Sequence, residues 1–124
     1  MSDQKALILF AHGARDPRWA TPFERLQQLA SAELPSVPVH LAFLELMTPR
    51  LPEVVATLAA QGCQTITIVP VFLGQGGHVL RDLPELLEQL QVSWPALQFK
   101  IAAAVGESPD VLHAIASYCV ASAA

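Results

Sequence analysis

Four segments typical of strands alternate along the chain with four segments whose apolar residues recur every three or four positions. The first, 6–11, is apolar throughout, as expected of a strand covered on both faces. Further strands are predicted at 37–44, 65–69 and 98–104. This alternation predicts an α/β fold: a four-stranded parallel sheet with helices on both faces, in three layers. Right-handed crossovers favour the strand order 2-1-3-4.

Capping residues mark the predicted helix starts. Thr-Pro-Phe-Glu at 21–24 forms a capping box with Pro at the first helical position, and the first helix stops before Pro35. Thr-Pro at 48–49 opens the second helix, and Gly62 closes it. The apolar stripe of the first helix is Phe23, Leu26, Leu29 and Ala30.

The last two helices are placed by the same signals. Asp82 and Glu85 repeat the capping pattern and put Pro84 in the first turn, so a start at Asp82 is preferred to one at His78 with a kink at Pro84. Ser-Pro-Asp at 108–110 caps the last helix. The residues that this helix is expected to turn inward are Leu112, Ile115, Ala116 and Cys119.

Composition narrows the class of protein. The 124 residues predict a single domain, 1–124, and 52% are apolar, which excludes a disordered chain. Only 15% are charged, below the usual share of about 25%. Two explanations stay open: a partner chain that covers part of the surface, or a small compact domain. The net charge of −4 argues against nucleic acid as the main partner.

The cysteines and the N-terminus indicate where the protein works. Cys63 and Cys119 form no CxxC pair and are predicted to be reduced, buried thiols. Residues 1–5 lack the pattern of a signal peptide, and no apolar run approaches the roughly 20 residues of a membrane span. A cytoplasmic protein without a membrane partner is expected.

Two histidines occupy the predicted crevice of the sheet. His12 and His78 follow the first and third strands, and with the order 2-1-3-4 these carboxyl ends flank the switch point where ligands bind. Two imidazoles can hold a divalent metal such as cobalt, nickel or iron, and they can accept protons near neutral pH. His40 and His113 are interpreted as structural residues.

Other polar residues fall at the same edge. Glu45, after the second strand, can be a third metal ligand or a proton acceptor. Asp82 could orient His78, although capping alone would explain it. The arginines gather here as well, which indicates an anionic ligand. They are Arg15, Arg18, Arg50 and Arg81.

The glycine loop 74–78 does not match a nucleotide-binding motif. It lacks the Gly-Lys-Ser/Thr of a Walker loop and the GxGxxG of a dinucleotide turn, so no nucleotide cofactor is expected. Gly76 and Gly77 are interpreted as clearance beside His78. His12-Gly13 is also similar to the histidine phosphatases, but that family has Arg where Ala11 stands; phosphoryl transfer remains an alternative.

Three segments together resemble a known family, the small sirohydrochlorin chelatases of cobalamin and sirohaem synthesis (short-form class II chelatases). They are His-Gly-Ala-Arg-Asp-Pro at 12–17, Phe-Leu-Glu-Leu at 43–46 with Pro49, and 70–84 from Pro-Val-Phe-Leu to Asp-Leu-Pro. Ala14 stands where the family often has Ser. Residues 105–109 match only loosely, so no role is assigned to them.

The resemblance implies ATP-independent insertion of Co2+, or of Ni2+ or Fe2+, into sirohydrochlorin or a related tetrapyrrole. His12 and His78 would bind the metal and accept pyrrole protons, with Glu45 assisting. The implied substrate-binding residues are Arg15, Arg50, Gly76, Gly77 and Arg81. One small domain offers a broad macrocycle a single wall, so a homodimer is expected. A non-catalytic metal or tetrapyrrole carrier would need the same ligands and stays open.

Overall fold

A parallel sheet forms the centre of the molecule. The computed structural model describes residues 4–74 and 77–124, with only the backbone of 77–80. The strands lie in the order β2-β1-β3-β4, as predicted, and all three neighbouring pairs are parallel. The strands are β1 (Lys5–Ala11), β2 (Val39–Phe43), β3 (Thr65–Pro70) and β4 (Gln98–Ile101).

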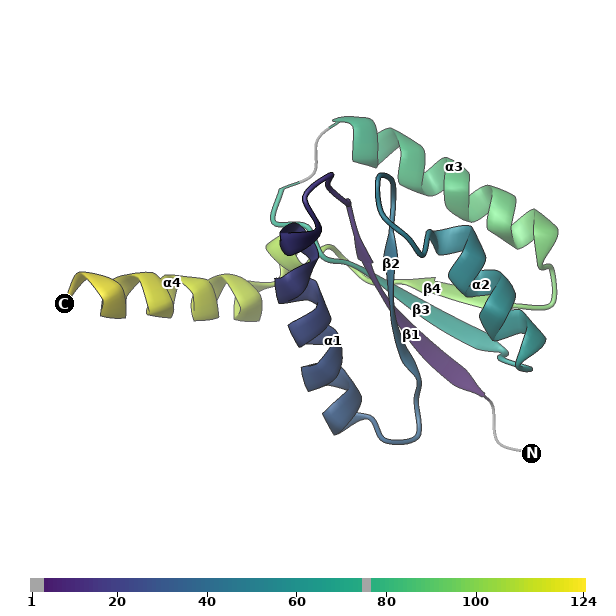
Figure 1. Cartoon of the computed structure of the whole chain (residues 1–124), viewed down its shortest axis with the longest axis horizontal. Helices are drawn as coiled ribbons and strands as arrows, with labels where there is room; N and C mark the ends of the chain where they lie inside the picture. Colours follow the sequence, from purple (N-terminus) through teal and green to yellow (C-terminus); the bar gives the residue numbers. More distant parts are fainter. Residues whose placement is uncertain (1–3, 75–76) are drawn as a thin grey trace.

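Helices cover both faces of the sheet, which confirms the predicted fold class. Figure 1 shows α1 on one side of the strands and α2 with α3 on the other. No helix in the described part of the chain is long and apolar enough to cross a membrane. The helices are η1 (Pro17–Ala20), α1 (Thr21–Glu33), α2 (Leu51–Ala60), α3 (Gly77–Ser93), η2 (Val105–Glu107) and α4 (Pro109–Ala123).

Side chains that alternate along the strands supply two apolar clusters. Ile8 and Ile68 are fully buried toward α2 and α3, where they meet Leu51 and other residues of that cluster. Leu9 points to the opposite face and packs with Val39 in the cluster beneath α1. Each fully buried aliphatic side chain contributes about 1.5–3 kcal/mol to the stability of the fold. The central strands therefore hold both layers and fix their carboxyl ends.

Two strands are shorter than predicted because proline interrupts the ladder. β2 begins at Val39 rather than Val37, and Pro38 has no N–H to donate. β4 ends at Ile101 rather than Ala104. Ala102 N still donates to Ile68 O (3.0 Å), but the next bond of a parallel ladder would need an N–H from Pro70.

The predicted starts of the first two helices need correction. Thr21 is the first residue of α1 and not its cap, because η1 leads directly into the helix. Asp16 caps η1 by accepting a hydrogen bond from Arg18 N. α2 begins at Leu51 rather than at 48–49. Glu53, in its first turn, accepts a hydrogen bond from Arg50 N (3.4 Å).

The predicted start of α3 at Asp82 is wrong. The helix begins at Gly77 and contains Pro84. Pro84 removes one backbone hydrogen bond, whereas Leu83 and Leu90 are buried against the sheet along the same stripe. This packing is the same for either start and explains why the helix tolerates Pro84, but not why it begins at Gly77.

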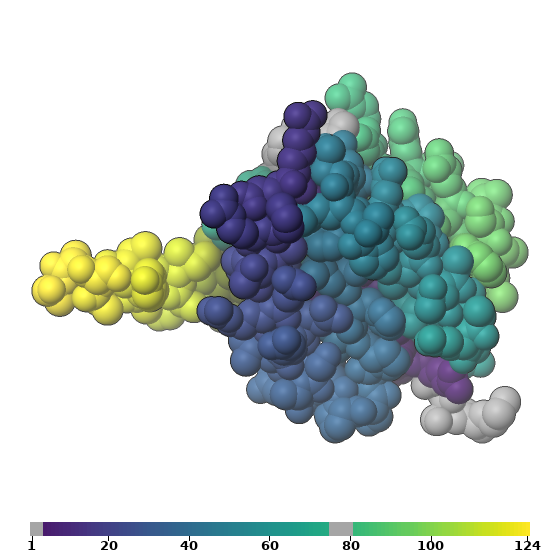
Figure 2. Space-filling model, viewed as in Figure 1, coloured from purple at the N-terminus to yellow at the C-terminus, as the bar shows by residue number. Residues whose placement is uncertain are grey.

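The prediction that α4 packs inward is also wrong. Leu112 is 48% exposed and Ile115 39%, and Ala116 and Cys119 are exposed too. Figure 2 shows α4 standing away from the rest of the molecule, in yellow. Cys119 is therefore not a buried thiol, whereas Cys63 is buried, and both are free. The helix leaves η2 in a direction that brings it to no face of its own sheet.

Candidate functional site

The backbone at the ends of β1 and β2 brings His12 and Glu45 together. The pairing of the two strands continues past their ends, because Leu44 N donates to Ala11 O (2.9 Å) and Glu45 N donates to His12 O (3.1 Å). Gly13 adopts a φ of 100°, and a β-carbon at this position would overlap the carbonyl oxygen of Glu45. Glycine is required here for both reasons.

The two side chains form an ion-pair geometry open to solvent. His12 Nε2 lies 3.2 Å from Glu45 Oε1, and the side chains are 38% and 39% exposed. The other ring nitrogen, Nδ1, lies 3.1 Å from Gly13 O. Each nitrogen therefore faces an oxygen acceptor, an arrangement that a protonated imidazole satisfies with both of its N–H groups. The two residues thus lie together at the carboxyl edge, while their roles as metal ligands or proton acceptors stay predictions.

The loop after Glu45 contains a strained backbone conformation and is held by a hydrogen bond from Arg50. Leu46 has a φ of 68°, a left-handed conformation that is costly for a residue with a β-carbon. Arg50 Nη2 donates to Leu44 O (3.0 Å) across this loop. Arg50, predicted to bind substrate, thus contacts the chain beside Glu45 and helps to hold its backbone. Strain of this kind is often found at functional sites.

A backbone hydrogen bond from η2 holds the residues that follow β3. Gly106 N donates to Phe72 O (2.9 Å). A β-carbon on Gly106 would overlap the backbone of Leu73, so only glycine allows this approach. Sequence reasoning assigned no role to 105–109. The available signal was a glycine just after the last strand, at the same edge of the sheet as His12.

Part of the predicted site lies outside the described residues. Gly76 is not described, and of Gly77 and His78 only the backbone is, at the start of α3. His78 was expected in a loop and instead lies in the first turn of the helix. Its approach to His12 stays a prediction. Asp82 is interior to α3, so the capping explanation for it does not hold.

The remaining arginines differ in their surroundings. Arg15 and Arg81 are exposed. Arg18 is committed to Asp16, since its Nη2 and Nε donate to that carboxylate at 2.7 and 3.1 Å. These hydrogen bonds lower the pKa of Asp16 below its ordinary value. Arg15 and Arg81 are thus better placed than Arg18 to receive an anion.

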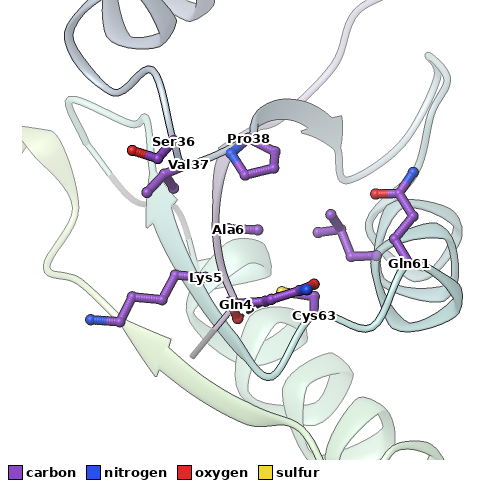
Figure 3. Close-up of a pocket in the computed structure, with 9 residues that line it drawn as sticks. Gln4, Lys5, Ala6, Ser36, Val37, Pro38, Gln61 and Cys63 are labelled. Atoms are coloured by element: carbon purple, nitrogen blue, oxygen red, sulfur yellow. Dashed lines mark hydrogen bonds between the residues drawn. The ribbon is translucent and has the colours of Figure 1, made fainter. Parts of the chain in front are cut away.

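Hollows occur at both ends of the strands. A hollow of ≈ 220 Å³ at the carboxyl edge is lined by Leu44, Arg50, Asp82 and other residues of α2 and α3. One of ≈ 520 Å³ lies at the opposite edge, where Figure 3 shows Lys5, Gln61 and Cys63 among its walls. Ligands of parallel α/β sheets bind at the carboxyl edge, so the His12 end is favoured.

The described side chains do not complete a metal site by themselves. Among them, no three His, Cys, Asp or Glu residues gather closely enough to hold an ion. His12 and Glu45 supply two of the three predicted ligands. Tetrahedral ligands about 2.1 Å from one metal lie roughly 3.4 Å apart, close to the separation of this pair. The pair can therefore share an ion with one more ligand and open positions.

The chain is similar throughout its length to known proteins. A family described as CbiX matches residues 6–120. The sirohydrochlorin cobaltochelatase of Methanopyrus kandleri is 34% identical over 89 residues, 72% of this chain and 62% of that protein. The enzyme of the same name from Methanocaldococcus jannaschii is 34% identical over 83 residues, 67% and 58% of the two chains. This chain thus spans about three fifths of these relatives.

Solved structures show the same architecture. The crystal structure of a cobalamin biosynthesis CbiX protein, described as putative, from Marinobacter aquaeolei covers 95% of this chain and 96% of its own, with a TM-score of 0.84 and 30% identity. The sirohydrochlorin chelatase SirB from Bacillus subtilis in complex with cobalt covers 92% of this chain with a TM-score of 0.74 and 23% identity. This chain covers 49% of that structure.

Proposed function

This chain belongs to the CbiX family, and we propose that it is a chelatase that inserts Co2+ into sirohydrochlorin or a related tetrapyrrole without ATP. The observation that carries the proposal is the pair formed by His12 and Glu45, 3.2 Å apart and open to solvent at the carboxyl edge. Imidazole and carboxylate are ligands that suit cobalt, nickel and iron. The sirohydrochlorin cobaltochelatases similar to this chain support the choice of reaction.

The reaction replaces two pyrrole N–H protons by one divalent ion. His12 is the proposed acceptor for one proton, because its ring nitrogens face Glu45 Oε1 and Gly13 O, and Glu45 would stabilise the imidazolium that forms. His78 is proposed as the second imidazole, which takes the other proton. An ion held by a few protein ligands with open positions can be passed to the macrocycle.

The substrate carries many carboxylates, so cations at the rim would bind it. Arg15 and Arg81 are proposed to do so, with Arg50 nearby, while Gly76 and Gly77 leave room beside His78. A second copy of the chain is proposed to supply the other wall of the binding site. The cytoplasmic location expected from the sequence stays a prediction.

The test is metal insertion by the purified full chain. Sirohydrochlorin is mixed with Co2+, Ni2+ or Fe2+, and the change in tetrapyrrole absorbance is followed against a control without protein. His12→Ala should slow insertion by about 100-fold or more, the usual contribution of a general base. The matched control is His40→Ala, a half-buried histidine within β2, which should retain the rate.

Each outcome of this assay is informative. No acceleration with any of the three ions overturns the proposed reaction. Tight binding of metal and tetrapyrrole without faster insertion supports the carrier instead. An equal rate in His12→Ala and the unmodified chain removes His12 from the mechanism, whatever the fate of the reaction.

A further inference from the structure

Two large apolar side chains are exposed beside the candidate site. Leu46 follows Glu45 after the end of β2 and is 56% exposed, and Leu73, shortly after the end of β3, is 66% exposed. β1, which leads to His12, lies between β2 and β3 in the sheet. An exposed leucine therefore follows the strand on each side of His12.

The polar residues of the site account for only part of a binding site for a flat macrocycle. In the proposed reaction His12 and Glu45 serve the metal and the pyrrole protons, while the arginines serve the carboxylates. The faces of the ring are apolar, and sites for small ligands are lined mostly by apolar side chains, with a few polar groups that fix the orientation. Leu46 and Leu73 are exposed apolar residues in the right place for this role.

The backbone of Leu46 is strained without compensation from packing. Its φ of 68° is readily adopted by Gly or Asn and is costly for leucine. Because more than half of the side chain is exposed, burial does not compensate for this cost. An observed strain of this kind points to a task other than folding. Leu46 is bonded directly to Glu45, so contact with a ligand of the site is such a task.

The backbone beneath both leucines is held by hydrogen bonds. Arg50 Nη2 donates to Leu44 O (3.0 Å), two residues before Leu46. Phe72 O, one residue before the other leucine, accepts from a backbone N–H of η2 (2.9 Å). Side chains on a backbone that is already ordered lose less conformational freedom when a ligand covers them, and this favours binding.

We infer that Leu46 and Leu73 contact the apolar faces of the tetrapyrrole on the two sides of His12 and hold the ring over the metal ligands. Strands that are separated by one other strand lie about 10 Å apart, a distance that one macrocycle spans. The inference rests on the proposed function and adds to it, because the arginines would bind the carboxylates and the leucines the ring itself. It also accounts for a leucine where glycine or asparagine would give a less strained loop.

The test is equilibrium binding of metal-free sirohydrochlorin to the full chain, followed by the absorbance of the tetrapyrrole. Leu46→Asn and Leu73→Asn should each raise the Kd about 10-fold, as expected for the loss of an apolar contact. Leu46→Met keeps an apolar side chain and should retain the Kd of the unmodified chain. The matched control is Val92→Asn, a residue that is 77% exposed near the other end of α3, which should also retain it.

Two further measurements distinguish contact with the ligand from a structural role. Asparagine tolerates the left-handed conformation, so Leu46→Asn should keep or raise the urea concentration at the midpoint of unfolding while it weakens binding of the tetrapyrrole. The same variant should leave the Kd for Co2+ and the molar mass in solution unchanged. Weaker binding that is accompanied by lower stability or by a changed molar mass indicates a structural role and overturns the inference.

The outcomes for this inference and for the reaction can be told apart. Equal Kd values for the unmodified chain, Leu46→Asn and Leu73→Asn overturn the inference and leave the chelatase intact. Weaker binding by these two variants, without metal insertion by the unmodified chain, supports the inference and overturns only the chelatase. A chain that does not bind the tetrapyrrole at all overturns both.

Discussion

α2 and α4 carry the same sequence signals, but α2 packs against the sheet and α4 stays exposed. Both have proline in the first turn and an apolar stripe at helical spacing. α2 buries Leu51, Val54, Val55 and Leu58, whereas α4 buries no side chain. The apolar pattern thus indicates that a helix will be covered, but it does not say by which surface.

The difference lies in how each helix is joined to the sheet. α2 connects β2 with β3, so both of its ends are tied to strands and its stripe has to lie across them. α4 follows η2 through Ser108 and, within the described residues, does not connect two strands of the sheet. A crossover helix is held against its own sheet by the strands on both sides of it, whereas no such pair of connections holds α4.

The largest effect on stability is expected when a leucine of α2 is replaced by alanine, and the same replacement in α4 provides the comparison. Leu58→Ala in α2 should lower the free energy of unfolding by about 2–5 kcal/mol, because Leu58 is 1% exposed and its loss leaves a cavity. Leu112→Ala in α4 should change it by about 0.5 kcal/mol or less in dilute protein. Urea denaturation at several protein concentrations measures both.

Varying the protein concentration distinguishes the two substitutions further. The effect of Leu58→Ala should not depend on protein concentration, whereas that of Leu112→Ala should grow as chains associate. If Leu112→Ala is as costly as Leu58→Ala at the lowest concentration, α4 is buried within a single chain and the contrast between the helices fails.

Much of the fold was predictable because it follows from connectivity. The alternation of strands and helices determines a parallel sheet, and right-handed crossovers leave few strand orders. The start of α3 was not, because the capping pattern at Asp82 and Glu85 is local and the helix runs through it from Gly77. Local signals predict helix ends poorly wherever tertiary contacts compete with them.

The meeting of His12 with Glu45 was predictable for the same reason, since the carboxyl ends of adjacent parallel strands share one edge. The contact of Gly106 with Leu73 was not. It joins segments more than 30 residues apart through backbone atoms, and no side-chain pattern marks such a contact. Arg18 was predicted to face a ligand and instead pairs with Asp16, two residues away.

A smaller effect is expected at the junction between the packed part of the chain and α4. Gly106→Ala should destabilise the protein by about 1–3 kcal/mol, because the new β-carbon displaces the backbone of Leu73. The displaced segment leads to the predicted ligand His78, and a shift of about 1 Å near a site can slow a reaction by about 100-fold. Unfolding and cobalt insertion are measured together.

Gly74→Ala is the matched control for this change. A β-carbon at Gly74 would meet no atom within 4 Å, so stability and insertion rate should stay near those of the unmodified chain. Equal losses in the two variants would mean that the loop tolerates no β-carbon anywhere. The contact between η2 and Leu73 would then have no special part in holding the site.

The smallest change uses the two natural thiols and alters neither the fold nor the sequence. Burial raises the pKa of Cys63, whose Sγ lies 3.4 Å from Thr65 O. Because the thiolate is the reactive form, a raised pKa leaves less of it at pH 8 and moves alkylation of Cys63 to higher pH. Cys119 is exposed on α4 and should react first in dilute protein. Its reaction with iodoacetamide, followed by mass spectrometry, should slow as protein concentration rises, while that of Cys63 stays constant. Constant rates at both thiols would show that association between chains does not cover Cys119 over this range of protein concentration.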